Sequence, residues 1–356
     1  MGRVVLVAGA SRYLGTRFAR LLSADPTVSR VIGVDVVPPS GDIGTCEFVR
    51  ADIRNPIIAK VMVSESVDTV VHMNVIATPT GAGGRVAMKE INVIGTMQLL
   101  AACQNAPSVR RVVVKSTTAV YGASPSDPTS FTEDADARAL PRSGWGKDSV
   151  EVEGYVRGFS RRRPDVAVST LRLANIVGPG IRTPLTDYFA LPVLPTVLGF
   201  DPRLQLLHED DALEAMRLAT LGEGVGIVNV AADGVLLLSQ AAGIAGRPTV
   251  PVPSQLTRVV WQLMRRSKVI DFSPEQVRFL TYGRVVDTTR MRQVLGLQPR
   301  FSTRAAFVDF VSGRALHGPL SPDVVDGAFE QAMSLLNRVL PAAPVAAGSA
   351  GERHDG

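Results

Sequence analysis

The sequence predicts an α/β fold in which a doubly wound parallel sheet carries a smaller C-terminal lobe. Short β-branched runs alternate with helix-length segments through the first half of the 356-residue chain, which is typical of strand–helix–strand units. A glycine turn follows the first run and opens a helix. After about residue 176 prolines and glycines become frequent and the alternation stops.

The predicted strands are residues 4–7, 31–34, 46–49, 69–71, 112–114 and 166–171. Several of them are continuously apolar, as expected for strands that are covered on both faces. The segments between them include helices expected at about 13–23, 85–105 and 144–162. Sheets of this kind have right-handed crossovers and bind ligands at the carboxyl ends of their strands, where the strand order reverses.

The turn after the first strand has the features of a pyrophosphate site. Backbone N–H groups and the positive end of the following helix dipole would face the ligand. We expect Gly9 to make the tight turn and Gly15 to let the helix pack close to the strand. The residues expected to bind a cofactor here are Gly9, Ser11, Arg12, Tyr13, Leu14 and Gly15.

Asp35 ends the second predicted strand. An acidic residue about 20 positions after the glycine turn accepts hydrogen bonds from the ribose 2′-hydroxyl and repels a 2′-phosphate. The turn and Asp35 together therefore predict a nicotinamide dinucleotide site that favours NAD over NADP.

These features divide the chain into three parts. We expect residues 1–176 to form an NAD-binding Rossmann domain, to which a strand near 225–231 returns. Residues 177–340 would form most of a substrate-binding lobe, with helices near 255–267 and 324–340. The Ala/Pro/Gly-rich residues 341–356 would be a disordered tail.

Composition favours a globular protein with a small anionic ligand. The net charge is +5, and the arginines are scattered apart from Arg161-Arg162-Arg163. We interpret that run as a solvated turn after a helix, because a charge run alone is weak evidence for a nucleic-acid surface. Cys46 and Cys103 have no CxxC spacing and the four histidines share no metal-ligand spacing, so no metal site is expected. We expect no signal peptide, because a glycine turn at Gly9 interrupts the first apolar run. The sequence has no apolar run of the ~18–20 residues that a membrane span needs, so we expect a cytoplasmic protein without an integral membrane segment.

On these motifs the chain, from about residue 3 to about 312, resembles an extended short-chain dehydrogenase/reductase of the NAD-dependent epimerase/dehydratase family, the group of UDP-glucose 4-epimerase. In that family the turn reads Gly-x-x-Gly-x-x-Gly, whereas Arg12 here replaces the middle glycine. Its Cβ would crowd the pyrophosphate, or its guanidinium would pair with a phosphate. The second alternative resembles shorter family members that bind NADP, but Asp35 favours NAD.

The resemblance also assigns other cofactor-side residues. Asp52 and Ile53 match the residues that contact the adenine, and Asn92 matches an asparagine that braces the active-site strand. Met73 and Asn74 stand where the family has smaller residues, so the turn after the fourth strand is expected to be crowded.

The segment that should hold the catalytic residues departs from the family. Residues 114–122 resemble the active-site strand, with Ser116 on the cofactor side and Thr117 as the hydroxyl that hydrogen-bonds the reacting oxygen. The family then has Tyr-x-x-x-Lys, in which the Tyr moves a proton and the Lys lowers its pKa. This pair is missing here.

Two alignments of that segment are possible. In one, Trp145 replaces the Tyr and Ser149 the Lys; in the other, Lys147 is retained and Ser143 replaces the Tyr. The first needs no gap and is preferred. An indole cannot act as an acid or base near neutral pH, so the proton would come from another group, and the candidates are Tyr121, Lys147, Asp148 and Tyr155.

On the substrate side, Asn175 matches a family residue that contacts the substrate diphosphate. Arg203 lies one position before the family's phosphate-binding arginine, where Leu204 stands instead. The hypotheses are an epimerase/dehydratase of a nucleotide sugar with a non-standard proton relay, a catalytically silent NAD-binding sensor or partner protein, or an oxidoreductase of a lipid or steroid-like alcohol. The resemblance suggests a homodimer through the helices near 85–105 and 144–162.

Overall fold

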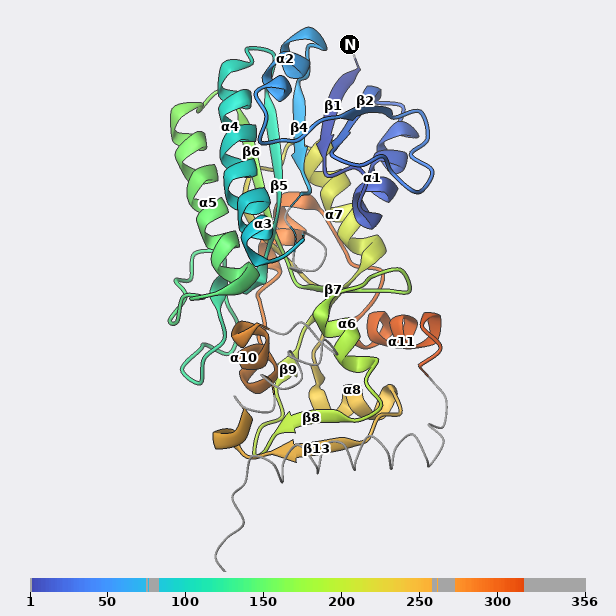
Figure 1. Ribbon diagram of the computed structural model, residues 1–356, viewed down its shortest axis with the longest axis vertical. Helices are drawn as coiled ribbons and strands as arrows, with labels where there is room; N and C mark the ends of the chain where they lie inside the picture. The colour runs from blue at the N-terminus through green and yellow to red at the C-terminus, as the bar shows by residue number, and fades with distance from the viewer. Residues whose placement is uncertain (1, 75, 77–82, 258–260, 262–272, 317–356) are drawn as a thin grey trace, which may run out of the picture.

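The computed structural model describes residues 2–74, 76, 83–257, 261 and 273–316, and it confirms the predicted α/β class (Figure 1). The helix expected near 324–340, the tail 341–356 and most of the helix expected near 255–267 lie outside the described residues. The doubly wound sheet forms the upper part of the molecule in Figure 1, and the C-terminal lobe lies below it.

The central sheet has seven parallel strands in the order β11-β6-β5-β4-β1-β2-β3. The strand order reverses between β1 and β4. β1 pairs with β2 on one side, where Leu6 lies opposite Ile32, and with β4 on the other, where Leu6 lies opposite Val70. The strands are β1 (Arg3–Ala8), β2 (Val28–Asp35), β3 (Glu47–Arg50), β4 (Thr69–His72), β5 (Arg111–Thr117), β6 (Ala167–Leu173) and β11 (Gly226–Val230).

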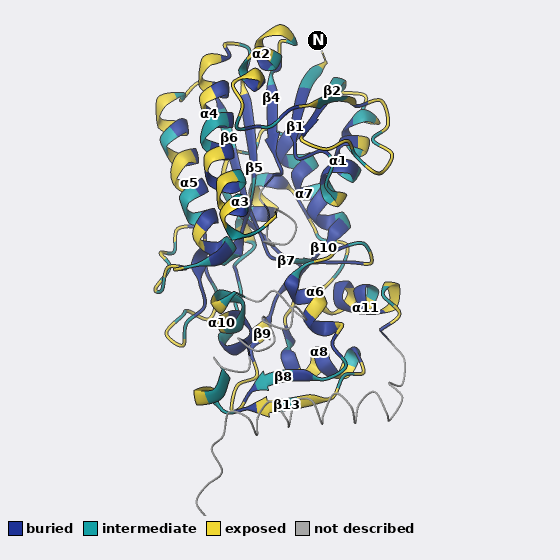
Figure 2. Cartoon of the chain, in the orientation of Figure 1, coloured by how far each residue is buried: buried dark blue, intermediate teal, exposed yellow. Residues whose placement is uncertain are grey.

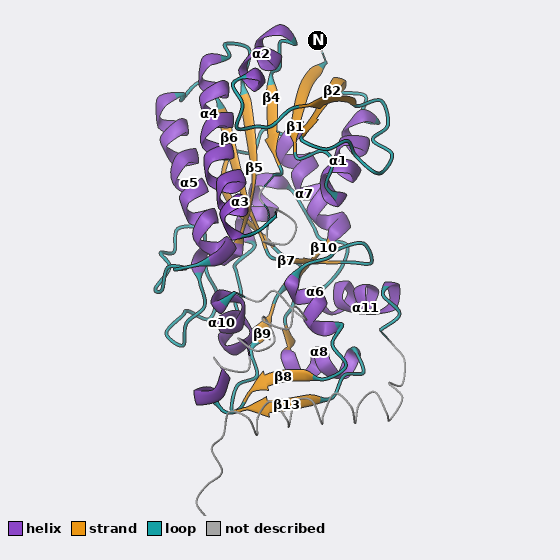
Figure 3. Cartoon of the chain, in the orientation of Figure 1, coloured by secondary structure: helices purple, strands orange, loops and turns teal. Residues whose placement is uncertain are grey.

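Helices cover both faces of this sheet (Figures 1 and 3). One face carries α1 (Tyr13–Ser23) and α7 (Glu209–Leu221). The other carries α2 (Ile57–Ser64), α3 (Arg85–Lys89), α4 (Gly95–Asn105) and α5 (Gly144–Arg162). A π-helical turn, Glu90–Ile94, joins α3 to α4, and a short 3₁₀ turn, Thr118–Tyr121, follows β5.

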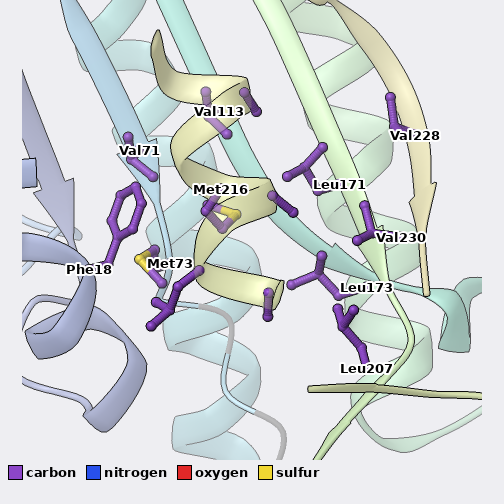
Figure 4. Close-up of a cluster of buried hydrophobic side chains, with 14 of the residues drawn as sticks. Phe18, Val71, Met73, Val113, Leu171, Leu173, Leu207, Met216, Val228 and Val230 are labelled. Carbon is purple, nitrogen blue, oxygen red and sulfur yellow. The ribbon is translucent and has the colours of Figure 1, made fainter. Parts of the chain in front are cut away.

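The apolar runs of the strands form a core on each face of the sheet (Figure 2). In the cluster beneath α1 and α7, Phe18 and Met216 pack against Val71, Val113 and Leu171 (Figure 4). Fully burying one such side chain stabilises the fold by about 1.5–3 kcal/mol. This packing fixes α1, and therefore the turn that precedes it, against the carboxyl end of the sheet.

The C-terminal lobe has its own core, which contains the T-shaped pair Phe189 and Phe307 with ring centroids 4.7 Å apart. Three two-stranded sheets, β10-β7, β12-β9 and β13-β8, support it. Its elements are β7 (Asn175–Val177), α6 (Pro184–Phe189), β8 (Leu194–Val197), β9 (Arg203–Leu204), β10 (Leu206–His208), β12 (Leu236–Leu237), α8 (Leu238–Ile244), β13 (Thr249–Val252), α10 (Pro274–Tyr282), a π-helical turn (Met291–Leu295) and α11 (Thr303–Gly313).

A buried ion pair holds α5 to the carboxyl ends of β5 and β6. Arg172 donates to both carboxylate oxygens of Glu153, with Nη2–Oε2 at 2.7 Å and Nε–Oε1 at 3.0 Å. The Ser116 hydroxyl donates to Glu153 Oε1 at 2.6 Å, and Arg172 Nη1 donates to the Tyr121 hydroxyl at 2.7 Å. Because both charges are almost fully buried, each depends on the other for compensation.

We therefore expect Glu153→Ala to lower the free energy of unfolding by about 3–5 kcal/mol, because it leaves the Arg172 charge buried without its partner. Urea denaturation measures the loss. The control is Glu151→Ala on the same helix, where a half-exposed carboxylate lies 3.7 Å from Lys89 and a change within about 0.5 kcal/mol is expected. Equal effects of the two substitutions would contradict the role given to the buried pair.

Candidate functional site

The glycine turn between β1 and α1 is packed so closely that two of its positions exclude a side chain. Gly9 has φ +94°, and a Cβ there would lie 3.0 Å from the backbone nitrogen of Asn74. A Cβ on Gly15 would lie 1.9 Å from the Gly9 carbonyl oxygen. The start of α1 therefore rests directly on the turn, at the point where β1 and β4 end side by side.

Asp35 ties this turn to the end of β2. Its Oδ2 accepts the Ser11 N–H at 3.1 Å and its Oδ1 accepts the Val36 N–H at 2.8 Å. The Ser11 hydroxyl donates to the Val37 carbonyl in the same place. The carboxylate is mostly buried but still forms part of the wall of the adjoining cavity, so it can meet a ligand there.

The amides at the start of α1 receive no side-chain cap, because the residue in the N-cap position is Arg12. Uncapped N–H groups and the helix dipole together make an anion site. Arg12 Nε donates to Asn74 Oδ1 at 3.4 Å, so two residues that depart from the family pattern contact each other. Burial lowers the pKa of Arg12, an effect that the nearby Asp35 charge opposes.

A cavity of about 740 Å³ extends from the turn to the C-terminal lobe, a size typical of ligand pockets. Residues from both parts of the chain line it, among them Ser11, Arg12, Tyr13, Leu14, Gly15, Asp35, Met73, Ile76, Lys115, Ser116, Trp145, Asn175, Arg182, Pro184, Leu185, Glu275, Phe279 and Arg284. The turn, its uncapped amides and Asp35 thus open into one space that also borders the C-terminal lobe.

The described lining of the cavity carries a net positive charge. Four cations, Arg12, Lys115, Arg182 and Arg284, face two carboxylates, Asp35 and Glu275, a difference of two. Arg284 is held by donating its Nε to the Gly122 carbonyl at 2.7 Å and by lying over the Phe279 ring. Its burial lowers the pKa of Arg284 to about 10, so it stays charged at neutral pH. The cavity therefore suits ligands with several phosphate charges.

Trp145 occupies the wall of this cavity at the start of α5. Its indole N–H is buried and has no hydrogen-bond partner in the part of the chain that the structure describes. The Ser149 hydroxyl donates back to the Trp145 carbonyl at 3.0 Å, and Ser143 contacts Glu275 at the helix start. The structure thus places Trp145, and neither Ser143 nor Lys147, on the described wall of the cavity.

The four groups that the sequence offered as proton sources all lie away from the described cavity wall. Tyr121 is stacked on Phe131, and its hydroxyl is hydrogen-bonded to Asn229. Asp148 is fully buried and forms a bidentate ion pair with Arg85 at 2.6 Å. Lys147 is exposed on α5, and so is Tyr155 at 39%.

Other predicted site residues have structural partners. Thr117 caps the 3₁₀ turn by accepting the Ala119 N–H at 3.1 Å. Asp52 binds Arg54, and Ile53 is buried against α4, where a Cβ on Gly95 would lie 2.7 Å from Ile53 Cδ1. The cofactor and catalytic roles predicted for these three residues stay predictions.

Asn92 is fully buried and braces the chain after β4. Its amide nitrogen donates to the Ile76 carbonyl at 2.9 Å and to Asp148 Oδ2 at 3.3 Å, while its oxygen accepts the Ile76 N–H at 2.7 Å. Ile76 lines the cavity. Asn92 therefore positions the cavity wall.

The two predicted substrate residues lie in different places. Asn175 lines the large cavity, whereas Arg203 lines a second cavity of about 390 Å³ and donates to the Thr129 carbonyl at 3.0 Å. Arg284 borders both cavities.

Sequence reasoning missed the roles of Lys115, Arg182, Glu275 and Arg284 in the cavity wall. Lys115 alone carried a signal, because a lysine directly follows the apolar run 112–114 of a strand that is covered on both faces. The other three come from the irregular lobe, where no periodicity indicates which way a side chain points.

Within the described residues there is no group of three or more His, Cys, Asp or Glu side chains that could hold a metal ion. Burial raises the pKa of Cys46 to about 11 and that of Cys103 to about 12, so neither thiol forms much thiolate near neutral pH. Among the helices of the described ranges, none has the length and apolarity needed to cross a bilayer.

Residues 5–231 match the model of the NAD dependent epimerase/dehydratase family. The chain belongs to this family. An uncharacterized protein of Mycobacterium tuberculosis is 50% identical over 340 residues, which cover 94% of this chain and 90% of that protein. The expected family is therefore confirmed, and the expected cofactor, NAD, agrees with the family's name.

Solved structures show the same fold at low sequence identity. UDP-glucose 4-epimerase of Thermotoga maritima, solved with UDP-glucose, is 18% identical with a TM-score of 0.66 and covers 87% of this chain and 98% of its own. dTDP-glucose 4,6-dehydratase of Bacillus anthracis, solved with NAD, is 16% identical with a TM-score of 0.66 and covers 92% and 100%.

The packing at the turn predicts that Gly15→Ala destabilises the protein. Its methyl group would overlap the Gly9 carbonyl, and overpacking of this kind costs about 1–3 kcal/mol or more. Thermal and urea unfolding measure the effect. The control is Gly243→Ala in α8, where nothing lies within 4 Å of the added Cβ and a gain of about 0.5–1 kcal/mol is expected. A neutral Gly15→Ala would contradict the close approach of α1 to the turn.

Proposed function

We propose that this chain binds NAD and acts on a nucleotide sugar by transient hydride transfer, with a proton relay that does not use Tyr-x-x-x-Lys. The observation that carries the proposal is the continuous cavity that joins the glycine turn to the C-terminal lobe, whose described wall bears four cations against two carboxylates. Hydride chemistry needs both reactants in one space that excludes water.

The chain's own residues supply each part of the cofactor site. The uncapped amides of α1, with Arg12 beside them, would hold the pyrophosphate, and Asp35 would accept hydrogen bonds from a ribose. When bound, NAD supplies a reversible hydride acceptor. The rest of the chemistry, which is to orient the substrate and move a proton, falls to residues of the cavity wall.

The lobe would contribute the substrate side. Arg182, Arg284 and Asn175 face the cavity from segments after β6, and guanidinium groups bind phosphate oxygens through paired hydrogen bonds. A nucleoside diphosphate group fits this set of residues better than a neutral alcohol does. The indole N–H of Trp145, which lacks a described partner, could donate a hydrogen bond to a substrate oxygen without exchanging its proton.

A second candidate is a catalytically silent NAD-binding sensor or partner protein. It is favoured by Trp145, a non-ionising side chain of the cavity wall, which in the preferred alignment takes the place of the family's tyrosine. The lipid or steroid-like alcohol hypothesis draws on Pro184, Leu185 and Phe279, which are apolar residues of the same wall, but it leaves Arg182 and Arg284 without a ligand.

The cofactor preference is expected to depend on Asp35. Wild-type protein should bind NAD at least about tenfold more tightly than NADP, because a carboxylate repels the 2′-phosphate. Asp35→Asn should weaken the binding of NAD by roughly 10–100-fold, which corresponds to the loss of ~1.5–3 kcal/mol from hydrogen bonds to a charged group. The same substitution should reduce the ratio of NAD affinity to NADP affinity to under about threefold, because the carboxylate that repels the 2′-phosphate is gone. Calorimetric titration with both dinucleotides measures this.

The control for that titration is Asp42→Asn, an exposed carboxylate near Arg20 that lies outside the described cavity wall. It should bind both dinucleotides as wild type does. An Asp35→Asn variant with an unchanged ratio of NAD to NADP affinity would remove Asp35 from the cofactor site.

Turnover tests the proposed function itself. Purified protein is incubated with NAD and UDP-glucose, absorbance at 340 nm reports single-turnover reduction of the cofactor, and NMR of the sugar reports any epimer or dehydrated product. Reduction or product formation supports the proposal. NAD binding with no change in any sugar nucleotide tried would favour the silent alternative, and no NAD binding at millimolar ligand would overturn both.

A further inference from the structure

We propose that the side-chain amine of Lys115 is the proton-exchanging group of this cavity, in the role that the family's tyrosine performs where Trp145 stands here. The inference rests on the proposed function and makes it more specific, because it assigns the proton to a residue of β5 rather than to the start of α5.

The composition of the cavity wall carries the inference. Among the described lining residues, six have full charges, namely Arg12, Asp35, Lys115, Arg182, Glu275 and Arg284. Arginine does not release a proton near neutral pH. Asp35 already accepts hydrogen bonds from two backbone N–H groups, those of Ser11 and Val36. Glu275 already accepts hydrogen bonds from Arg142 and Ser143 at the start of α5.

Lys115 differs from these groups in its surroundings. It lies near the carboxyl end of β5, directly before Ser116. Because side chains alternate between the two faces of a strand, Lys115 lies on the same face of β5 as Thr117, two residues further on. No hydrogen bond or ion pair joins its ammonium group to another residue of the described ranges. It therefore faces the cavity as a cation available to a ligand.

The groups around Lys115 favour loss of its proton. Desolvation by the cavity wall, followed by the charge of Arg12, lowers the pKa of Lys115 to about 8. His72, at the end of the neighbouring strand β4, is neutral at this pH because burial and Lys115 lower the pKa of His72 to about 4. Glu153 and Arg172 compensate each other beneath Ser116. Glu275 and Asp35 are the acidic groups of the described wall.

The proton balance of the reaction is then complete. Oxidation of a secondary alcohol removes a hydride from carbon, for which the cofactor is the acceptor, and a proton from oxygen. The neutral amine of Lys115 takes that proton and becomes an ammonium. Reduction of the resulting carbonyl returns the same proton to oxygen as the hydride returns to carbon, so an epimerisation leaves Lys115 as it began.

The first test measures the ionisation of Lys115 directly, without cofactor or turnover. The chain has five lysines, so ¹³Cε-labelled lysine gives few NMR signals in the full-length protein. One signal should titrate with a midpoint near 8, and this signal should be missing from Lys115→Met. The methionine variant should fold, because it keeps the length of the side chain and removes a charge from a desolvated site. A Lys115 midpoint above about 10 would overturn the proposal.

The second test follows single-turnover reduction of bound NAD by UDP-glucose between pH 6 and 10. The wild-type rate should rise through pH 8 as the amine loses its proton. Lys115→Met and Lys115→Arg should both lower the rate by roughly 100-fold or more and lose the rise near pH 8. Lys60→Met, an exposed lysine on α2, is the control and should keep the wild-type profile.

The arginine variant distinguishes a role of Lys115 in proton exchange from a role of its positive charge in binding phosphate. If Lys115→Arg keeps the rate and the pH profile while Lys115→Met loses only affinity for NAD or UDP-glucose, Lys115 is a phosphate ligand and the proposal is wrong. Failure of the proposed function has a different signature, because the wild-type protein would then give no reduction at any pH while its Lys115 signal still titrated near 8.

Discussion

The rest of the structure depends on one constraint, which is the close approach of the start of α1 to the turn after β1. Gly15 has no side chain where the Gly9 carbonyl lies, so α1 can start directly at the carboxyl end of the sheet. Phe18, packed in the core beneath the helix, fixes its direction. The uncapped amides, Arg12 and the loop held by Asp35 are all placed by this one contact.

The departures from the family pattern converge on the cavity above that contact. Arg12 and Asn74, both larger than the residues they replace, contact each other. Trp145 and Lys115 lie on the same wall. Behind this wall the supporting contacts are strong, because Arg85 pairs with the buried Asp148 and Arg172 pairs with Glu153.

Sequence predicted most of the sheet because continuous apolar runs can only be buried on both faces. The helices 13–23 and 144–162 were predicted with their observed bounds, and the helix at 85–105 contains a π-helical turn that apolar periodicity does not reveal. The positions of Asn175 and Arg203 in separate cavities, and of Arg284 between them, could not be predicted. They depend on how an irregular lobe folds back over the sheet, which involves contacts between residues far apart in the chain.

The most direct test of the account is whether NAD enters the cavity that Trp145 lines. The chain has two tryptophans, Trp145 and Trp261, and Trp261 is buried in the C-terminal lobe near Tyr188. In a Trp261→Phe variant all indole fluorescence comes from Trp145. The account predicts saturable quenching of this fluorescence on titration with NAD. A folded Trp261→Phe protein whose emission stays unchanged up to millimolar NAD would contradict it.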